Sequence, residues 1–405
     1  MQTTSRQAYL DWLRIMAILG VLFFHSAMPY VSEWGWHIKN NETSNLLMEF
    51  NFWLSRFRMP LLFFISGTVS YFMLKNKSTG SFIGLRFRRL FIPLLFGMLV
   101  IVPPQVYMER LTQGLHGNFF DFYPTIFQTG AYPKGNLSWH HLWFIFYLFV
   151  YDIIFAPLFK YIISEKGKSI LQRLNFFANR KMIYLLMLPG IIIYTSLTMK
   201  FPTTNDFIHD WCSIFYWLQF LLVGFICIAN PALMNSIERN RRTSFAIAFL
   251  SFLFINYIRW NSYEPWNVIS DYRHDWRTYG FLSLYAITAW CWVMTAVGYG
   301  KKYLNRKVKA LNYINQAVYP FYILHQTVIV VLTYYVVKTN ESIISKYLFT
   351  VILTFIISLS VYHLFIRPFA LTRLLFGAKP EKKMDKNKIH QPAEPIIAHQ
   401  VPATI

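Results

Sequence analysis

Long apolar stretches recur along the chain and are separated by shorter polar segments. Each stretch is close to the roughly 20 residues with which a helix crosses the hydrocarbon core of a bilayer. We therefore predict an all-α integral membrane protein with about ten transmembrane helices in one bundle. The predicted spans are 9–30, 49–74, 87–108, 141–163, 181–199, 212–229, 243–260, 278–299, 313–337 and 346–367.

Basic residues gather in alternate connections between these spans. Loops that stay in the cytoplasm carry an excess of lysine and arginine, whereas translocated loops do not. The basic connections are 75–89, 160–181, 239–242, 301–309 and 367–388. An even number of spans puts both termini on the same side, so we predict that both termini are cytoplasmic. The predicted external loops are 31–48, 109–140, 200–211, 261–277 and 338–345.

The composition agrees with the bilayer as the main solvent. Hydrophobic residues make up 55% of the chain and charged residues only 14%, against a charged share of about 25% in soluble domains. The net charge of +21 is spread over the cytoplasmic connections, which argues against a nucleic-acid partner. We predict a multi-pass membrane domain over 1–376 and a basic, disordered cytoplasmic tail over 377–405.

Neither a processed leader nor a cysteine-based site is predicted. The first apolar stretch carries Arg14 and His25 and lacks the basic start and small-residue exit of a signal peptide, so we expect it to be retained. Cys212, Cys227 and Cys291 have no paired spacing. They therefore predict no disulfide, and we expect no metal site.

The first span carries three ionisable residues, which are costly to bury in a membrane and are therefore candidates for function. Asp11, Arg14 and His25 are offset by 3 and 11 residues from one another, which places them on one helical face. Arg14 and His25 lie about 16 Å apart along the axis. A guanidinium near the cytoplasm suits phosphate groups, and a deeper imidazole suits proton abstraction from a hydroxyl. Structural pairing of Asp11 with Arg14, and of His25 with a neighbouring helix, is an equal alternative.

Five motifs in chain order resemble elements of the membrane acyltransferase 3 family. Arg14, ten further residues and His25 resemble the Arg-x10-His signature of the family. The segment Arg86-Phe87-Arg88-Arg89 resembles its Arg-x-x-Arg element. The other matches are 57–67 (FRMPLLFFISG), 141–144 (HLWF) and 319–325 (YPFYILH). The resemblance runs from about Arg6 to Gly377.

Within this family the chain most resembles the glucan biosynthesis protein C branch. The run 57–67 and the ending 366–368 with 376–377 carry that likeness. The resemblance implies a membrane-bound O-acyltransferase of a bacterial inner membrane. It implies transfer of a succinyl or acetyl group from cytoplasmic acyl-CoA to a hydroxyl of an extracytoplasmic carbohydrate, such as a periplasmic glucan. Acyl-CoA is then a substrate, and no bound cofactor is expected.

The resemblance also assigns roles to individual residues. His25 would be the catalytic base, and Arg14 would help to hold the donor. Arg86 and Arg89 would lie near the donor phosphates, although plain positive-inside anchoring of these two arginines is also open.

Two further pairs of residues are predicted to line the site. His325 and Tyr322 lie one helical turn apart in the ninth span. His325 could orient the acyl carbonyl, bond His25 or be a satisfied buried histidine. His141 and Trp143 begin the fourth span, where a tryptophan can also belong to the interfacial aromatic belt.

The sequence favours direct transfer over an acyl-enzyme. It contains no Gly-x-Ser-x-Gly elbow, no His-Glu-x-x-His pair and no cysteine beside a motif histidine. Aromatic and acidic residues in the predicted external loops could hold sugar rings and hydroxyls, although an interfacial aromatic belt is the better explanation for at least half of them. A multi-pass transporter or a flippase of a glycan-related or lipid-linked substrate is the alternative, because buried arginine and histidine also suit carriers. An inactive relative that scaffolds a glycan assembly complex is a third possibility.

Overall fold

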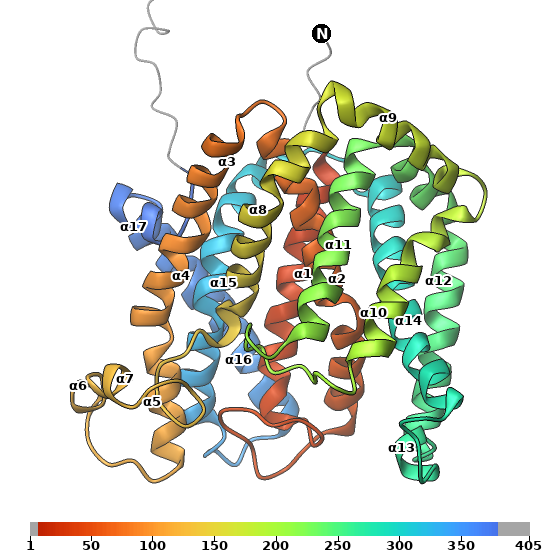
Figure 1. The fold of residues 1–405 in the computed structure, drawn as a ribbon. Coiled ribbons are helices and arrows are strands. Elements are labelled where there is room, and N and C mark those ends of the chain that lie inside the picture. The colour runs from red at the N-terminus through yellow and green to blue at the C-terminus, as the bar shows by residue number, and fades with distance from the viewer. Residues whose placement is uncertain (1–6, 380–405) are drawn as a thin grey trace, which may run out of the picture.

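The computed structural model describes residues 7–379, and regular structure in this range is helical throughout (Figure 1). Nine helices or helix runs in the range are long and apolar enough to cross a membrane, and a bent pair makes a tenth. The predicted all-α membrane class is therefore confirmed. The long helices are α1 (Ala8–Ala27), α2 (Asn45–Leu74), α8 (Trp143–Ile162), α11 (Trp211–Ala229), α12 (Pro231–Trp260), α14 (Trp276–Tyr303), α15 (Lys309–Val336) and α16 (Ile343–Val361).

The third predicted span is one long helical run with two irregular turns. It extends from Thr79 to Thr112, beyond the predicted 87–108 at both ends. Two π-helical segments interrupt it, each of which widens the helix locally and shifts its register. Its parts are α3 (Thr79–Arg86), a π turn (Phe87–Phe91), α4 (Ile92–Phe96), a second π turn (Gly97–Ile101) and α5 (Pro103–Thr112).

The fifth predicted span differs most from a straight helix. The run Met182–Leu197 begins as a 3-10 segment and continues as α10 (Leu188–Leu197). It bends by 116° from the run Glu165–Ala178, which contains α9 (Glu165–Arg173). The remaining short elements are 3-10 turns at Met28–Tyr30, His140–Leu142 and Leu174–Ala178, α6 (Phe119–Phe122), α7 (Thr125–Gln128), α13 (Pro265–Val268), a π turn at Tyr362–Ile366 and α17 (Ala370–Leu375).

Some helices continue past the apolar windows that predicted them. Helix α12 begins at Pro231, whereas the predicted span began at 243. Its first three turns carry Arg239, Arg241 and Arg242, so this basic connection is helical. An apolar window marks only the part of a helix in hydrocarbon, and polar residues continue the helix into the aqueous layer.

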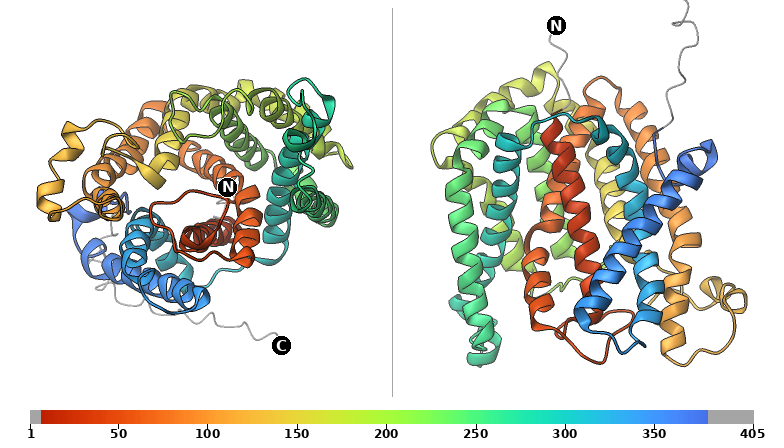
Figure 2. Two further views of the ribbon diagram at one scale, coloured as in Figure 1. Left: turned by 90° about the horizontal axis from the view of Figure 1, so that it is seen from below. Right: turned by 180° about the vertical axis from the view of Figure 1, so that it is seen from behind.

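Helix α1 lies among the other helices of the bundle and is open on one side (Figure 2). It packs against α2, α14, α15 and α16. The start of α1 and the short helix α17 lie toward one end of the bundle, and the loops 31–44 and 113–139 lie at the other (Figures 1 and 2). Most of the surface of α1 therefore contacts the protein, whereas Met16 and Phe23 are exposed.

Two glycines allow α2 and α11 to touch through their backbones. A Cβ atom on Gly67 would lie 2.0 Å from the carbonyl oxygen of Leu221, and one on Gly224 would lie 2.0 Å from that of Phe64. Helices in a bilayer associate largely through such close contact between small residues. A side chain at either position would force the two helices apart.

Candidate functional site

His25 of α1 meets His325 of α15 inside the bundle. Their Nδ1 and Nε2 atoms are 3.0 Å apart, and the side chain of His325 is almost fully buried. Of the alternatives predicted for His325, the geometry therefore brings it into direct contact with His25. Trp36 also packs on the His25 ring, with centroids 5.3 Å apart.

The hydrogen-bond partners determine which nitrogen of each histidine ring carries the proton. The Nδ1 atom of His325 lies 2.6 Å from the carbonyl oxygen of Tyr322. A carbonyl can only accept, so Nδ1 of His325 donates and its Nε2 is an acceptor in the neutral ring. The Nδ1–H of His25 therefore donates to His325. This order leaves the lone pair of His25 on Nε2, which is the state that a general base requires.

His141 lies beside this pair of histidines and is held on both sides by α15. Its Nε2–H donates to the carbonyl of Ile323 over 3.0 Å, and its own carbonyl accepts from the Tyr322 hydroxyl. The His141 and His325 ring centroids are 5.2 Å apart. The Nδ1 atom of His141 is buried and makes no hydrogen bond within residues 7–379. Of the two predicted residues at this end of the fourth span, His141 therefore joins the histidine cluster.

Trp143 occupies a different environment from His141. Its ring packs against Tyr147 and Trp217 at centroid distances of 5.2 and 6.4 Å, and against Phe63 at 6.3 Å. Trp143 was predicted to line the site. In the structure its ring packs α8 against α2 and α11.

Arg58 is a cation near the histidine cluster that the sequence did not predict as a site residue. Its guanidinium carbon lies 3.3 Å from the centroid of the Phe24 ring, and it interacts electrostatically with His25, His325 and Tyr322. Its Nε and Nη1 atoms are buried and have no hydrogen-bond acceptor in the described part of the chain. Two N–H donors are therefore available beside the proposed base.

A cavity of about 140 Å³ joins the three arginines predicted to hold the donor. Arg14, Arg86 and Arg89 all line it, and Tyr322 lines it as well. Because Tyr322 also contacts His141 and His325, the cavity extends from the arginines toward the histidine cluster. Asp11 is buried on α1 and is not part of the cavity lining.

Asn315 orients Arg14, the first of these three arginines. The Arg14 guanidinium donates to the backbone carbonyl of Asn315 over 3.0 Å and also to its side-chain oxygen. Asn315 itself lines the cavity. This contact fixes the Arg14 side chain on the cavity wall.

The second arginine forms a buried ion pair. Arg86 Nε lies 2.7 Å from a carboxylate oxygen of Asp152, and the two side chains are 5% and 0% exposed. Arg86 also donates to Ser70, which donates to Asp152. The sequence predicted either donor binding or membrane anchoring for Arg86. It did not predict the ion pair with Asp152. Asp152 interrupts the apolar fourth span, and that signal alone could have identified it.

The start of the predicted disordered tail belongs to the cavity. Gly377, Ala378 and Lys379 line it beside Arg89, and α17 ends there with Gly377 at φ 62°. A Cβ atom on Gly377 would lie 2.7 Å from the Arg89 carbonyl. The first three residues of the predicted tail thus line the cavity, and positions 380–405, where the rest of that tail was predicted, lie outside the described part of the chain.

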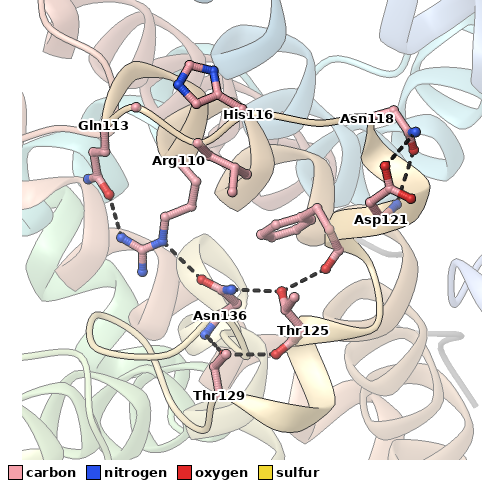
Figure 3. A pocket seen from close by; sticks show the side chains of 11 residues that line it. Arg110, Gln113, His116, Asn118, Asp121, Thr125, Thr129 and Asn136 are labelled. Atoms are coloured by element: carbon pink, nitrogen blue, oxygen red, sulfur yellow. Dashed lines mark hydrogen bonds between the residues drawn. The ribbon is translucent and has the colours of Figure 1, made fainter.

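A second, polar cavity of about 390 Å³ opens among the loops at the other end of the bundle (Figure 3). The Arg110 side chain donates to Asn136 over 3.0 Å and to Gln113 over 2.7 Å. Asn118 and Asp121 bond each other on the opposite wall over 2.7 Å. The pocket is lined by Arg110, Gln113, Gly114, Leu115, His116, Asn118, Asp121, Phe122, Thr125, Thr129 and Asn136.

Comparison with known proteins gives a consistent family. A family model described as "Acyltransferase domain" matches residues 7–363. Proteins named Glucans biosynthesis protein C from Escherichia coli K12 and O157:H7 are each 24% identical over 398 residues, covering 95% of this chain and 97% of theirs. A protein of that name from strain O6:K15:H31 is equally similar. No solved structure matches. With its membrane-spanning helices, the chain is a membrane acyltransferase and belongs to the acyltransferase 3 family.

Proposed function

We propose that the protein transfers a succinyl or acetyl group from cytoplasmic acyl-CoA to a hydroxyl group of an extracytoplasmic carbohydrate. One observation carries the proposal. The arginine-lined cavity and an imidazole with a defined lone pair lie on the same central helix, joined through Tyr322. An anionic donor and a base-catalysed acyl transfer need these two features.

The donor is proposed to bind at the end of the bundle with the basic connections. Arg14, Arg89 and the exposed Lys379 supply positive charge at the cavity, and guanidinium groups bind phosphates through paired hydrogen bonds. The cavity volume of about 140 Å³ is below the roughly 300–1,000 Å³ of common ligand pockets. We therefore place the thioester arm inside and the nucleotide at the mouth.

The proposed chemistry is a direct transfer. His25 Nε2 takes the proton of the acceptor hydroxyl as its oxygen attacks the thioester carbonyl carbon. Arg58 donates hydrogen bonds to the negative oxygen of the tetrahedral intermediate. The carbon–sulfur bond then breaks, the carbonyl re-forms, and the thiolate takes the proton from the His25 imidazolium. The products are the O-acyl ester and free coenzyme A.

The acceptor is proposed to reach the base from the opposite end. The polar cavity in Figure 3 offers amide, carboxylate and guanidinium groups, which match the hydroxyl groups of a sugar. The printed name of the relatives, Glucans biosynthesis protein C, favours a glucan. The proposed location is therefore the inner membrane of a bacterium, with the carbohydrate in the periplasm.

Donor turnover tests the proposal directly. The purified chain in detergent is mixed with acetyl-CoA or succinyl-CoA, and free thiol is measured with and without periplasmic glucan. Thiol release that requires the glucan, with the ester found on the sugar, would support the proposal and identify the donor. Binding of neither thioester would favour the carrier or flippase instead.

Arg89 and Arg86 are expected to fail in different ways when each is replaced by glutamine. R89Q should weaken donor binding about tenfold or more, because a hydrogen bond to a charged group contributes roughly 1.5–3 kcal/mol. R86Q should instead destabilise the protein by about 3–5 kcal/mol, because it leaves Asp152 buried without its partner. Calorimetric binding of the donor and thermal unfolding measure the two effects.

The double variant R86Q/D152N provides the control. It removes both charges of the buried pair, so its thermal stability should return most of the way to that of the original protein. Equal losses of stability in R86Q and R86Q/D152N would show that the ion pair is not the cause. Unchanged donor affinity in R89Q would show that Arg89 does not bind the donor and would favour a role in membrane anchoring.

A further inference from the structure

A second cluster of ionisable side chains lies at the loop end of the bundle. It adjoins the histidine cluster, since His140 precedes His141 and His37 interacts electrostatically with His25, but none of its members lines the arginine-lined cavity. It joins His37 from the loop after α1, Glu109 from α5 and His140 from the turn before α8. One nitrogen or oxygen ligand atom from each residue lies within 4.8 Å of the other two. These residues are far apart in the sequence, so no spacing pattern predicts them.

We propose that His37, Glu109 and His140 bind one divalent transition-metal ion, with Zn²⁺ as the best match. Two imidazoles and one carboxylate form a known ligand set for zinc, in which a fourth position stays open. Zinc–ligand bonds of about 2.1 Å put ligand atoms roughly 3.4 Å apart. The ligand atoms therefore need to move inward by only about an ångström. The proposal does not depend on acyl transfer.

His140 provides the observation that points to a ligand. Its Nε2 atom is buried and makes no hydrogen bond within the described residues. Its Nδ1 atom lies 3.1 Å from the hydroxyl of Ser138, and its backbone has φ 38°. A residue other than glycine in this region costs conformational energy, which is a reason to look for a function. Ser138 occupies Nδ1, so Nε2 is the nitrogen of His140 that has no hydrogen-bond partner among the described residues.

Glu109 is held in a matching way. Its Oε1 atom accepts from the Tyr132 hydroxyl over 3.0 Å and from Gln113 over 3.3 Å, and Oε2 contacts Nδ1 of His37. The Tyr132 side chain is half-buried, and its phenol O–H donates to the carboxylate. In metal sites, the atom of a ligand side chain that does not bind the metal is typically hydrogen-bonded to a neighbouring residue.

His37 must change its tautomer for this site to form. Gln326 Nε2 lies 3.2 Å from His37 Nε2 and 3.1 Å from the Gln105 side-chain oxygen. Metal binding at Nδ1 puts the proton on Nε2, which then needs an acceptor. If the side-chain amides of Gln326 and Gln105 both rotate by 180°, the Gln326 oxygen becomes the acceptor for His37 Nε2–H. The rotation exchanges the amide oxygen and nitrogen at little steric cost. Thr327 follows by turning its hydroxyl from the Ile101 carbonyl to Gln105.

Metal content of the full-length protein tests the proposal. The chain is purified in detergent without a histidine tag, stripped with a chelator, incubated with excess Zn²⁺ and passed over a desalting column. We expect about one zinc ion per chain by mass spectrometry. Co²⁺ in place of Zn²⁺ should give visible d–d absorption with the intensity of a four-coordinate site. Both signals should be lost in E109Q and in H140N, since asparagine tolerates the backbone of position 140.

His274 supplies a matched control. It forms an exposed contact of 2.9 Å with Asp271 in another loop, so it tests whether any surface histidine–carboxylate pair retains zinc. H274A should keep the full metal content. Zinc below 0.2 ions per chain in the original protein, or equal zinc in E109Q, H140N and H274A, would overturn the proposal. In either case the cluster would be a hydrogen-bonded ion pair only.

Discussion

Replacing His25 by alanine is expected to lower the turnover of acyl donor by about 10²–10⁴-fold, the usual contribution of a general base. Donor affinity should stay within about twofold, because the arginine-lined cavity lies along the same helix toward its other end. Steady-state thiol release in the presence of glucan gives kcat, and donor titration gives the dissociation constant. Turnover equal to that of the original protein in H25A would remove the proposed base.

His325 distinguishes positioning from plain packing. In the proposed proton order, its Nε2 accepts from His25 Nδ1–H, so His325 acts through His25 and not on the substrate. H325Q keeps an acceptor oxygen at similar reach and should retain more turnover than H325A. The two variants should also differ in the pH profile of kcat, because only H325A frees the His25 tautomer. Identical pH profiles in H325Q and H325A would show that His325 contributes only to packing.

Replacing Arg58 by glutamine is expected to lower kcat by about 10²–10³-fold, as for removal of an oxyanion donor. The physical reason is that the two buried N–H donors of Arg58 have no acceptor in the described residues until charge develops on the thioester oxygen. The KM for the donor should change much less than kcat. Single-turnover measurement of thiol release separates this chemical step from product release.

Arg56 is the matched control for Arg58 on the same helix. Its guanidinium bonds Ser55 and packs on the rings of Phe52 and Tyr285, away from the histidine cluster. R56Q should therefore keep kcat within about threefold, while R58K, which keeps the charge but not the fork of donors, should recover only part of the activity. Equal loss in R56Q and R58Q would indicate a general need for charge on α2.

The number and class of the helices could be predicted because membrane-crossing segments are marked by length and apolarity alone. The same windows could not show that α12 begins at Pro231, since a helix in the aqueous layer has no apolar requirement. They also gave no sign of the 116° bend before Met182. That bend depends on how the run packs against its neighbours.

The site was predicted in part. Placing Arg14 and His25 on one face follows from helical periodicity, and the resemblance to the family supplied Arg86, Arg89, His141, Tyr322 and His325. Their meeting across α1, the third span, the turn before α8 and α15 depends on packing that one sequence does not encode locally. The same holds for the pairing of Arg86 with Asp152. Arg58 was visible within a family motif, but its unpaired donors appear only in three dimensions.

The two π turns of the third span have a consequence for insertions and deletions. Each π turn holds one more residue than an α turn. Loss of one residue within Phe87–Phe91 would restore a regular helix and rotate Arg86 by about 100° relative to Glu109 at its far end. Arg86 would leave Asp152, although no contacting residue had been substituted. Apart from Arg89, the count of residues in this stretch matters more than their identity, so lineages are expected to accept substitutions at its other positions more readily than changes of length.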